Sequence, residues 1–344
     1  MTDNGHPHTT QHRDGVRVAV VGAGQFGELH ADAYRANPDC RLVAIVDRNV
    51  ERARAVAART GAPAAYASIE QLLAAEQVDG VSIATAGAHH LAPTIAALRA
   101  GASVLLEKPV VLRADEAITL ADAADQAAGF VLPAHILRFA APYRELANRL
   151  AAGAVGTPRA LSFRRHRTIE HDSLFPDVHP VLMTMVHDID LALWLDGSRP
   201  TSVTARQLRI AGRAQPAVVW AEVETDSGSI WSFQVSWSLA GAGGLPDALE
   251  VIGDSGALSL SLGARVSDFG PSAAAVDDTL TPGGSHGALG EEVRAFVDAI
   301  RFGIAPAGPT LGEAIDGLAL AHRIIQAAES SATGPEPHGE GRPA

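Results

Sequence analysis

The chain lacks several features that mark secreted, membrane-spanning or nucleic-acid-binding proteins. Cys40 is the single cysteine among 344 residues, so neither an intramolecular disulfide nor a cysteine-ligated metal cluster can form. Positive charge is in deficit, because the formal net charge is -12, and this argues against a nucleic acid or a membrane surface as a partner. No apolar run reaches the ~20 residues that a membrane-spanning helix requires.

The two ends of the chain lack the patterns of folded or targeting segments. Residues 1–14 are polar and do not show the charged-then-apolar order of a signal peptide. We therefore expect a cytoplasmic protein in which residues 1–14 and 331–344 form disordered tails.

The rest of the chain is long enough for two domains, and its pattern changes near residue 134. Because 47% of the residues are hydrophobic, a large core is possible. We predict one domain at residues 15–133 and a second at residues 134–330, whose last helix can pack back on the first domain.

The first part alternates buried β-branched runs with helical patterns, which is typical of a parallel sheet with helices on both faces. This predicts a doubly wound α/β domain. The expected strands cover residues 16–21, 80–85, 103–106 and 130–133, and the expected helices cover residues 50–60, 69–76, 91–99 and 114–128.

The second part contains runs in which polar and apolar residues alternate, separated by turn signals. This predicts an α+β domain on an open, mainly antiparallel sheet with helices on one face. The expected strands cover residues 159–167, 202–210, 217–224, 230–238, 249–252 and 257–262, the expected helices cover residues 142–152, 181–195, 290–302 and 311–330, and surface loops are expected at residues 240–245 and 270–288.

A glycine motif joins the first strand to the first helix. Gly22, Gly24 and Gly27 have the G-x-G-x-x-G spacing of a dinucleotide-binding Rossmann domain, and Asp47 closes the second strand twenty residues after Gly27. The helix N-terminus offers N–H groups to a pyrophosphate, and Asp47 can accept hydrogen bonds from both ribose hydroxyls of an adenosine. A glycine-rich turn without a ligand is the alternative interpretation.

Further motifs resemble those of the glucose-fructose oxidoreductase, inositol dehydrogenase and rhizopine-catabolism (Gfo/Idh/MocA) oxidoreductases. The similar stretches are residues 81–85 followed by His90, residues 97–109 ending in Glu-Lys-Pro, and residues 135–139, 185–195 and 250–258. The resemblance implies a nicotinamide-dependent oxidoreductase for a small-molecule sugar, cyclitol or related polyol. It also implies a homodimer or homotetramer built through the open face of the second sheet.

Oxidation of a secondary alcohol needs a hydride acceptor, a base and a group that stabilises the developing alkoxide. His187 is the candidate base, since an unperturbed imidazole titrates near ~6.5. Lys108 can donate to the substrate oxygen, and could share the base role if burial and the nicotinamide cation lower its pKa. Both assignments match roles that the resemblance implies. Asp190, on the same helical face as His187, can orient the imidazole or pair elsewhere.

Structural interpretations of the same residues remain open. Lys108 could be a surface lysine, although the following proline holds it extended at a strand end, where ligands bind in an open parallel sheet. His187 could be a satisfied core histidine. The spacings of the four histidines between residues 166 and 187 do not fit a compact ligand motif, so no metal site is expected.

The remaining candidates are grouped by the contact that we expect them to make. The predicted cofactor contacts are Gly22, Gly24, Gln25, Phe26, Gly27, Asp47, Arg48, Thr85, His90, Glu107 and Lys108. The predicted substrate contacts are Lys108, Arg138, Arg165 and His187, and the predicted catalytic groups are Lys108, His187 and Asp190. Arg138 and Arg165 could also be structural charges.

Two positions depart from the family pattern. The family usually has Thr-Pro where this chain has Thr85-Ala86, and inositol dehydrogenase-like members have an aspartate where this chain has Met183. The second departure weakens any transfer of inositol specificity.

We expect an NAD(P)-dependent dehydrogenase that acts on CH–OH groups. Asp47 favours NAD, and the neighbouring Arg48 leaves NADP possible. The alternatives are a non-catalytic dinucleotide-binding sensor or regulator of the same fold, and an oxidoreductase whose cofactor does not exchange.

Overall fold

The computed structural model describes residues 15–240, 246–262 and 287–331. The predicted tail at 1–14 lies outside the described residues, as do most of the predicted loops at 240–245 and 270–288. The predicted tail at 331–344 also lies outside them, except for Ser331, which ends the last helix. The described residues form two compact units, one made of residues 15–145 and 287–316 and the other made of residues 146–240, 246–262 and 317–331. This division places residues 288–302 in the first unit, whereas the sequence assigned them to the domain at 134–330. In the described part of the chain, no helix combines the length and the apolar character needed to cross a membrane.

The first unit is built on a six-stranded parallel sheet with the strand order β3-β2-β1-β4-β5-β6, as predicted for a doubly wound domain. Its central strands are almost completely buried, because helices cover both faces. The strands are β1 (Val16–Val21), β2 (Cys40–Val46), β3 (Ala64–Tyr66), β4 (Gly80–Ile83), β5 (Ser103–Glu107) and β6 (Val131–Ala134).

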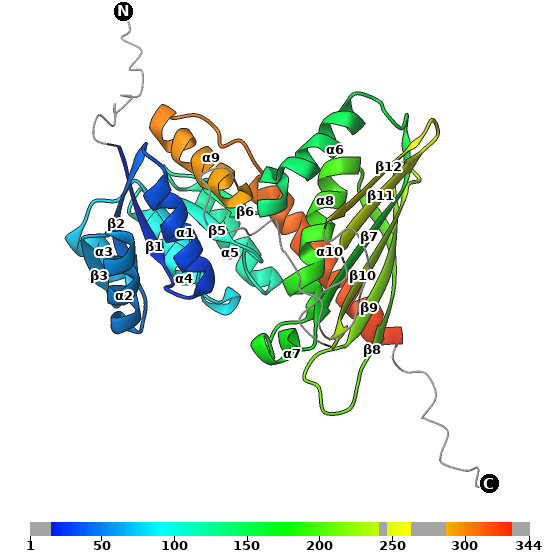
Figure 1. The fold of residues 1–344 in the computed structure, drawn as a ribbon, viewed down its shortest axis with the longest axis horizontal. Coiled ribbons are helices and arrows are strands. Elements are labelled where there is room, and N and C mark those ends of the chain that lie inside the picture. Colours follow the sequence, from blue (N-terminus) through cyan, green and yellow to red (C-terminus); the bar gives the residue numbers. More distant parts are fainter. Residues whose placement is uncertain (1–14, 241–245, 263–286, 332–344) are drawn as a thin grey trace, which may run out of the picture. The chain divides into compact units, whose positions relative to one another are not determined.

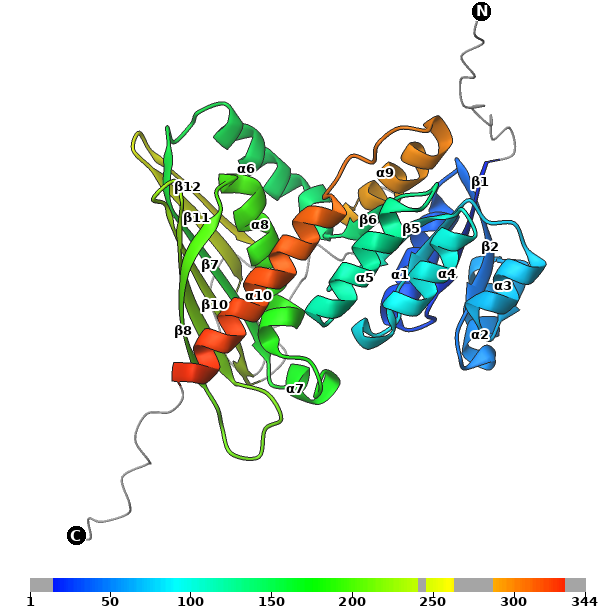
Figure 2. The same ribbon diagram turned by 180° about the vertical axis from the view of Figure 1, so that it is seen from behind.

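The helices of the first unit form two layers, which Figures 1 and 2 show from opposite sides. One layer contains α1 (Gln25–Ala36), α2 (Val50–Thr60) and α9 (Ala288–Phe302), and the other contains α3 (Ile69–Ala75), α4 (Leu91–Arg99) and α5 (Ala114–Asp125). Two short 3₁₀ helices, η1 (Gly87–His89) and η2 (Ile136–Phe139), follow strands β4 and β6.

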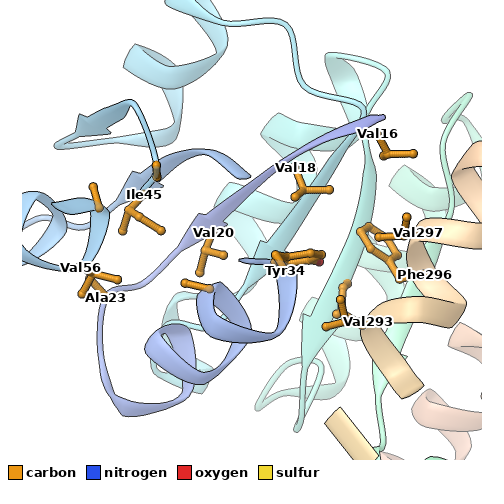
Figure 3. Packing of buried hydrophobic residues seen from close by; sticks show 14 of the residues in the cluster. Val16, Val18, Val20, Ala23, Tyr34, Ile45, Val56, Val293, Phe296 and Val297 are labelled. Atoms are coloured by element: carbon orange, nitrogen blue, oxygen red, sulfur yellow. The ribbon is translucent and has the colours of Figure 1, made fainter. Parts of the chain in front are cut away.

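Helix α9 belongs to the first unit because its apolar face fills the space beside β1. Figure 3 shows Val293, Phe296 and Val297 of this helix in one cluster with Val16 of β1 and Tyr34 of α1. Phe296 has no exposed surface. Burial of side chains of this size contributes about 1.5–3 kcal/mol each, so the contact strongly favours this placement.

The second unit is built on a six-stranded mixed sheet with the order β12-β11-β7-β10-β9-β8. The prediction of a mainly antiparallel sheet is confirmed, with one parallel pair formed by β7 and β10. The strands are β7 (Pro158–Thr168), β8 (Pro200–Leu208), β9 (Val218–Thr225), β10 (Ile230–Leu239), β11 (Asp247–Gly253) and β12 (Ala257–Leu262).

One face of this sheet is covered by helices α8 (Val186–Asp196) and α10 (Leu311–Ser331), as Figures 1 and 2 show. The side chains of Trp231, Phe233, Val235 and Trp237 on β10 are fully buried. The opposite face carries exposed apolar side chains, among them Trp220, Ile230 and Ile252, which are about half exposed.

Most predicted elements are found within three residues of their expected ends, including α6 (Ala141–Ala151). The short strand β3 and the one-turn helix α7 (Glu170–Leu174) were not predicted, because three to five residues carry too little periodicity. The helix predicted at 181–195 divides into a π-helical segment, η3 (Val181–Met185), and the α-helix α8.

Candidate functional site

The glycine loop between β1 and α1 has the close packing that its motif requires. Gly22 has φ +104°, and a Cβ there would lie 2.5 Å from the carbonyl oxygen of Ala84. A Cβ at Gly27 would lie 1.7 Å from the carbonyl oxygen of Gly22, so only glycine allows the helix to approach the loop. A Cβ at Gly24 would meet nothing within 4 Å, which leaves open space above the backbone where a pyrophosphate would bind.

Helix α1 begins at this open space. Gly24 is its N-cap residue and supplies no side chain to satisfy the first N–H groups. Gln25 is exposed and Phe26 is half-buried in the first turn. The N–H groups and the positive end of the helix dipole are therefore suited to an anionic ligand.

Asp47 lies at the carboxyl end of β2 and is held by two backbone groups. Its Oδ2 accepts a hydrogen bond from the Ala23 N–H at 2.8 Å, and its Oδ1 accepts one from the Asn49 N–H at 2.8 Å. A carboxylate has about four acceptor positions, so it can still accept hydrogen bonds from ribose hydroxyls. The side chain of Arg48 is exposed beside it. These residues fit an adenosine diphosphate.

His90 joins the loops that follow β4 and β5. Its Nδ1 lies 2.9 Å from the carbonyl oxygen of Pro109, and its Nε2 lies 3.0 Å from that of Thr85. Burial lowers the pKa of His90, while these two carbonyl groups and the charge of Glu107 act in the opposite direction. Both ring nitrogens of this predicted cofactor contact therefore face backbone oxygens, which indicates that the side chain positions the two loops.

Glu107, the last residue of β5, is held by a chain of buried hydrogen bonds from α1 and β4. Its Oε1 lies 3.0 Å from Nε2 of His30, whose Nδ1 lies 3.1 Å from Oγ of Ser82, and this hydroxyl group lies 2.7 Å from that of Tyr34. Burial acts to raise the pKa of Glu107, but the hydrogen bond and charge of His30, with the charge of Lys108, outweigh it and lower the pKa. Glu107 is thereby kept as an anion.

Lys108 follows Glu107 at the end of β5, where ligands bind in an open parallel sheet. Its backbone N–H donates to Oε2 of Glu107 at 3.1 Å, and its peptide bond to Pro109 is cis. Lys108 is the only lysine of the chain, whereas arginine occupies the other 26 of the 27 basic positions counted as Lys and Arg. Arginine cannot exchange a proton near neutral pH, and lysine can.

Arg138, a predicted substrate contact in η2, is 8% exposed and lies in an ion pair. Its Nη1 donates to Oε1 of Glu313 at 3.0 Å, and Glu313 also accepts the N–H of Thr310 at 2.7 Å. The contact therefore links η2 to the start of α10, which favours the structural interpretation of Arg138.

The predicted base is placed at the junction of two helix types. His187 is half-buried in the first turn of α8, directly after the π-helical segment, and Asp190 is 2% exposed. Met183 lies inside the π-helical segment, so the chain between Met183 and His187 is not a regular α-helical turn. π-helical segments often occur at functional sites.

Arg165, the other predicted substrate contact, lies in a buried ion-pair network. Its Nε and Nη2 donate to Asp188 at 3.0 and 2.9 Å, and its Nη1 donates to Asp247. Asp247 also accepts from Nη1 of Arg167 at 2.7 Å. Burial raises the pKa of Asp188 even though Arg165 opposes the shift. The network joins α8 to β7 and β11, which favours a structural role for Arg165.

The three histidines between residues 166 and 179 each have a different environment. His166 Nδ1 lies 2.8 Å from Oγ of Ser236, and His171 stacks at a tilt against Trp237. Burial lowers the pKa of His179 to about 4. Across the described ranges, no group of three or more His, Cys, Asp or Glu side chains is arranged to hold a metal ion.

Sequence reasoning missed the residues that hold Glu107. His30 and Tyr34 are four residues apart on α1, so their common face was a possible signal. Their partners Ser82 and Glu107 lie 48 to 77 residues away, and no local pattern identifies such pairs. Glu292 on α9, which is fully buried, was also missed.

Comparison with known proteins identifies both parts of the chain. Residues 16–135 match the oxidoreductase family with an NAD-binding Rossmann fold (GFO/IDH/MocA), and residues 143–259 match the GFO/IDH/MocA C-terminal domain. The UDP-N-acetylglucosamine 3-dehydrogenase of Acidithiobacillus ferrooxidans is 34% identical over 206 residues, which cover 60% of this chain and 62% of that protein. Inositol 2-dehydrogenase 3 of Saccharopolyspora erythraea is 28% identical over 326 residues, which cover 92% and 94%.

A solved structure shows the same fold. The scyllo-inositol dehydrogenase of Lactobacillus casei, crystallised with NAD(H) and scyllo-inositol, superposes with a TM-score of 0.81 at 19% identity over 92% of this chain and 98% of its own. The predicted resemblance and the two-domain fold class are confirmed. The chain therefore belongs to the GFO/IDH/MocA family of oxidoreductases and carries that family's NAD-binding Rossmann domain and C-terminal domain.

Proposed function

We propose that the protein transfers a hydride between NAD and a secondary alcohol of a sugar, cyclitol or related polyol. The matching relatives include proteins named as dehydrogenases of inositols and of UDP-N-acetylglucosamine, which share ring CH–OH groups. The single observation that carries the catalytic assignment is the position of Lys108, the chain's only lysine, at the end of β5.

The residues of the first unit fit NAD. The open backbone at Gly24 and the N-terminus of α1 would hold the pyrophosphate, and Asp47 would hold the adenosine ribose. When bound, NAD supplies the hydride acceptor. Its position relative to Lys108 would follow from the loops that His90 joins.

The proton chemistry is assigned to side chains of the protein. Lys108 Nζ donates a hydrogen bond to the substrate oxygen and stabilises negative charge that develops there. His187 takes the hydroxyl proton as general base, and its half-buried imidazole is compatible with that role. Asp190 is the candidate to orient the imidazole.

The test is a substrate panel with NAD and with NADP, read as formation of the reduced nicotinamide absorbance band. The panel contains myo- and scyllo-inositol, simple sugars and UDP-N-acetylglucosamine. Reduction of NAD with at least one ring polyol is the expected result. NAD binding without reduction by any of these, in the wild type, would instead support a dinucleotide-binding sensor.

We also propose a homodimer or homotetramer formed through the exposed face of the second sheet. The apolar side chains of Trp220, Ile230 and Ile252 on that face support this proposal. Light scattering measures the mass of the assembly in the wild type and in Trp220→Glu. The same mass in both proteins would refute the proposal.

A further inference from the structure

Glu292 is a buried acid that the proposed reaction does not use. It lies on α9 with no exposed surface, one helical turn before Phe296. Within the part of the chain that the structure describes, neither carboxyl oxygen has a hydrogen-bond partner. Buried polar atoms are almost always satisfied by protein or by ordered water, so this carboxyl group requires an explanation.

The surroundings of Glu292 determine its charge. Burial, and then the negative charge of Glu107, raise the pKa of Glu292 well above its ordinary value. These surroundings therefore favour the neutral acid over the carboxylate. Glu292 in turn helps to raise the pKa of Tyr34, so it lies near the hydrogen-bonded chain that holds Glu107.

The elements that pack against α9 include α1, β1, β5 and η2, and Glu107 of β5 is the anion whose charge acts on Glu292. Arg17 of β1 pairs with Asp79, and Arg138 of η2 pairs with Glu313. The titratable and charged side chains on these elements are Glu28, His30, Asp32, Tyr34 and Arg35 of α1, Arg17 of β1, Glu107 of β5, and His135 and Arg138 at η2, and Glu28 and Asp32 pair with Arg59.

The carboxylate of Glu107 has acceptor positions left for another hydrogen-bond donor. Its Oε1 faces His30 and its Oε2 accepts the backbone N–H of Lys108, whereas a carboxylate offers about four acceptor positions. A neutral carboxyl group provides one donor and an acceptor. A water molecule that accepts from the O–H of Glu292 and donates to Glu107 would satisfy both groups.

We propose that Glu292 is a neutral acid that binds an internal water molecule together with Glu107, and thereby positions the backbone of Lys108. Glu292 is a positioning residue, because it acts on Lys108 only through Glu107. The consequence for turnover rests on the proposed function, whereas the water site and the neutral state of Glu292 do not.

The test compares Glu292→Gln with Glu292→Leu in the full chain. Glutamine has the shape of the neutral acid and keeps a donor and an acceptor, whereas leucine removes both. The matched control is Glu291→Gln, the neighbouring acid on α9, which is partly exposed and pairs with Arg294. A crystal structure of the wild type should show one water within hydrogen-bonding distance of both Glu292 and Glu107, and a dry contact there would overturn the proposal.

The first readout is the NMR signal of the Lys108 side chain. Because the chain contains one lysine, isotopically labelled lysine gives a single side-chain signal. At pH 7 we expect this signal to coincide in wild type, Glu292→Gln and Glu291→Gln, and to be displaced in Glu292→Leu. Turnover should fall on the order of 10-fold in Glu292→Leu, with NAD affinity unchanged, and be restored in Glu292→Gln. An undisplaced Lys108 signal in a folded Glu292→Leu variant would overturn the proposal.

The second readout remains informative even if the leucine variant does not fold. An acid with a raised folded-state pKa stabilises the protein below its unfolded pKa of about 4.3, and this stabilisation is lost as the pH rises toward the folded-state value. The urea midpoint of the wild type should therefore fall relative to that of Glu292→Gln between about pH 5 and pH 8. A constant difference, or one of the opposite sign, would show that Glu292 is ionised. Neither this readout nor the NMR signal depends on a substrate, so failure of the proposed function would leave them unchanged.

Discussion

Nε2 of His30 lies 3.0 Å from Oε1 of Glu107, which joins the first helix of the Rossmann domain to the strand end that carries Lys108. Both partners are withdrawn from solvent, and the other ring nitrogen of His30 is engaged by Ser82. Buried charge-assisted hydrogen bonds of this kind fix geometry more firmly than exposed ones. The structure therefore indicates that the proposed catalytic lysine is positioned from inside the domain.

Lys108→Ala should leave NAD binding nearly intact and reduce turnover by ~10²- to 10⁴-fold, because general acid–base and charge-stabilising steps supply about that much. Lys108→Arg keeps the positive charge but cannot exchange a proton. This variant should therefore recover only the part of the lost turnover that depends on charge. Calorimetry with NAD and steady-state rates measure the two effects. Arg99→Ala, an exposed change on α4, is the control. Normal turnover in Lys108→Ala would remove Lys108 from the mechanism.

Glu107→Gln should destabilise the protein in a pH-dependent way. The pKa of Glu107 is lowered in the folded state, so its ionised form stabilises the protein above the unfolded pKa of about 4.3. This stabilisation is lost as the pH falls through the folded-state pKa. The unfolding midpoint of Glu107→Gln should therefore lie below that of the wild type at pH 7, and the two should converge in acid. Unfolding midpoints of the two proteins that differ by a constant amount across this pH range would contradict the stabilising role of ionised Glu107.

Site residues that belong to a local sequence motif were predictable, whereas pairings between residues far apart in the sequence were not. Gly22, Gly24 and Lys108 were identified because strand, turn and helix signals surround them within a few residues. The pairing of His30 with Glu107 spans 77 residues, and that of Arg165 with Asp188 spans 23, so neither follows from periodicity.

The same distinction applies to the elements of the fold. The ends of most helices and strands followed from periodicity and from Gly or Pro residues, because capping and turn chemistry are local. The parallel pairing of β7 with β10 depends on which strands become neighbours, and the placement of α9 depends on which apolar face Phe296 meets. Both are decided by packing between distant segments.

Two glycine substitutions should separate folding from cofactor binding. A Cβ at Gly24 meets nothing within 4 Å, so Gly24→Ala should fold normally but bind NAD more weakly, since the methyl group occupies the pyrophosphate position. A Cβ at Gly27 would lie 1.7 Å from the Gly22 carbonyl oxygen, so Gly27→Ala should destabilise the domain. Thermal unfolding and NAD titration of both variants provide the measurement. Unchanged NAD affinity in Gly24→Ala would place the pyrophosphate elsewhere.

The wild type should have a higher kcat/KM with NAD than with NADP. The carboxylate of Asp47 is fixed by the N–H groups of Ala23 and Asn49, and its charge repels a 2′-phosphate. Arg48 is exposed beside it and can pair with such a phosphate, so Arg48→Ala should widen the preference for NAD. Asp47→Ala should narrow it. A higher kcat/KM with NADP in the wild type would show that Arg48 sets the choice.

The last prediction concerns the acid that supports His187. The family resemblance implies an aspartate where this chain has Met183, and Met183 lies in a π-helical segment. Within α8 itself, Asp188 is engaged by Arg165, so Asp190 is the acid of that helix proposed to orient the imidazole. A nearby carboxylate stabilises the imidazolium and raises the pKa of a histidine.

His187→Ala should therefore lose much of kcat while the domain remains folded. Asp190→Asn should have a smaller effect, seen mainly as a shift of the acid limb of the pH–rate profile to lower pH, because the imidazolium loses its stabilising charge. Asp188→Asn is the contrasting variant, since it leaves Arg165 partly unpaired in a buried network and should reduce stability rather than move the acid limb. Circular dichroism and pH–rate profiles of the wild type and the three variants are the measurements. If Asp190→Asn leaves the acid limb in place, Asp190 does not orient His187; if His187→Ala keeps full activity, the base is another group, and Lys108 is the first to examine.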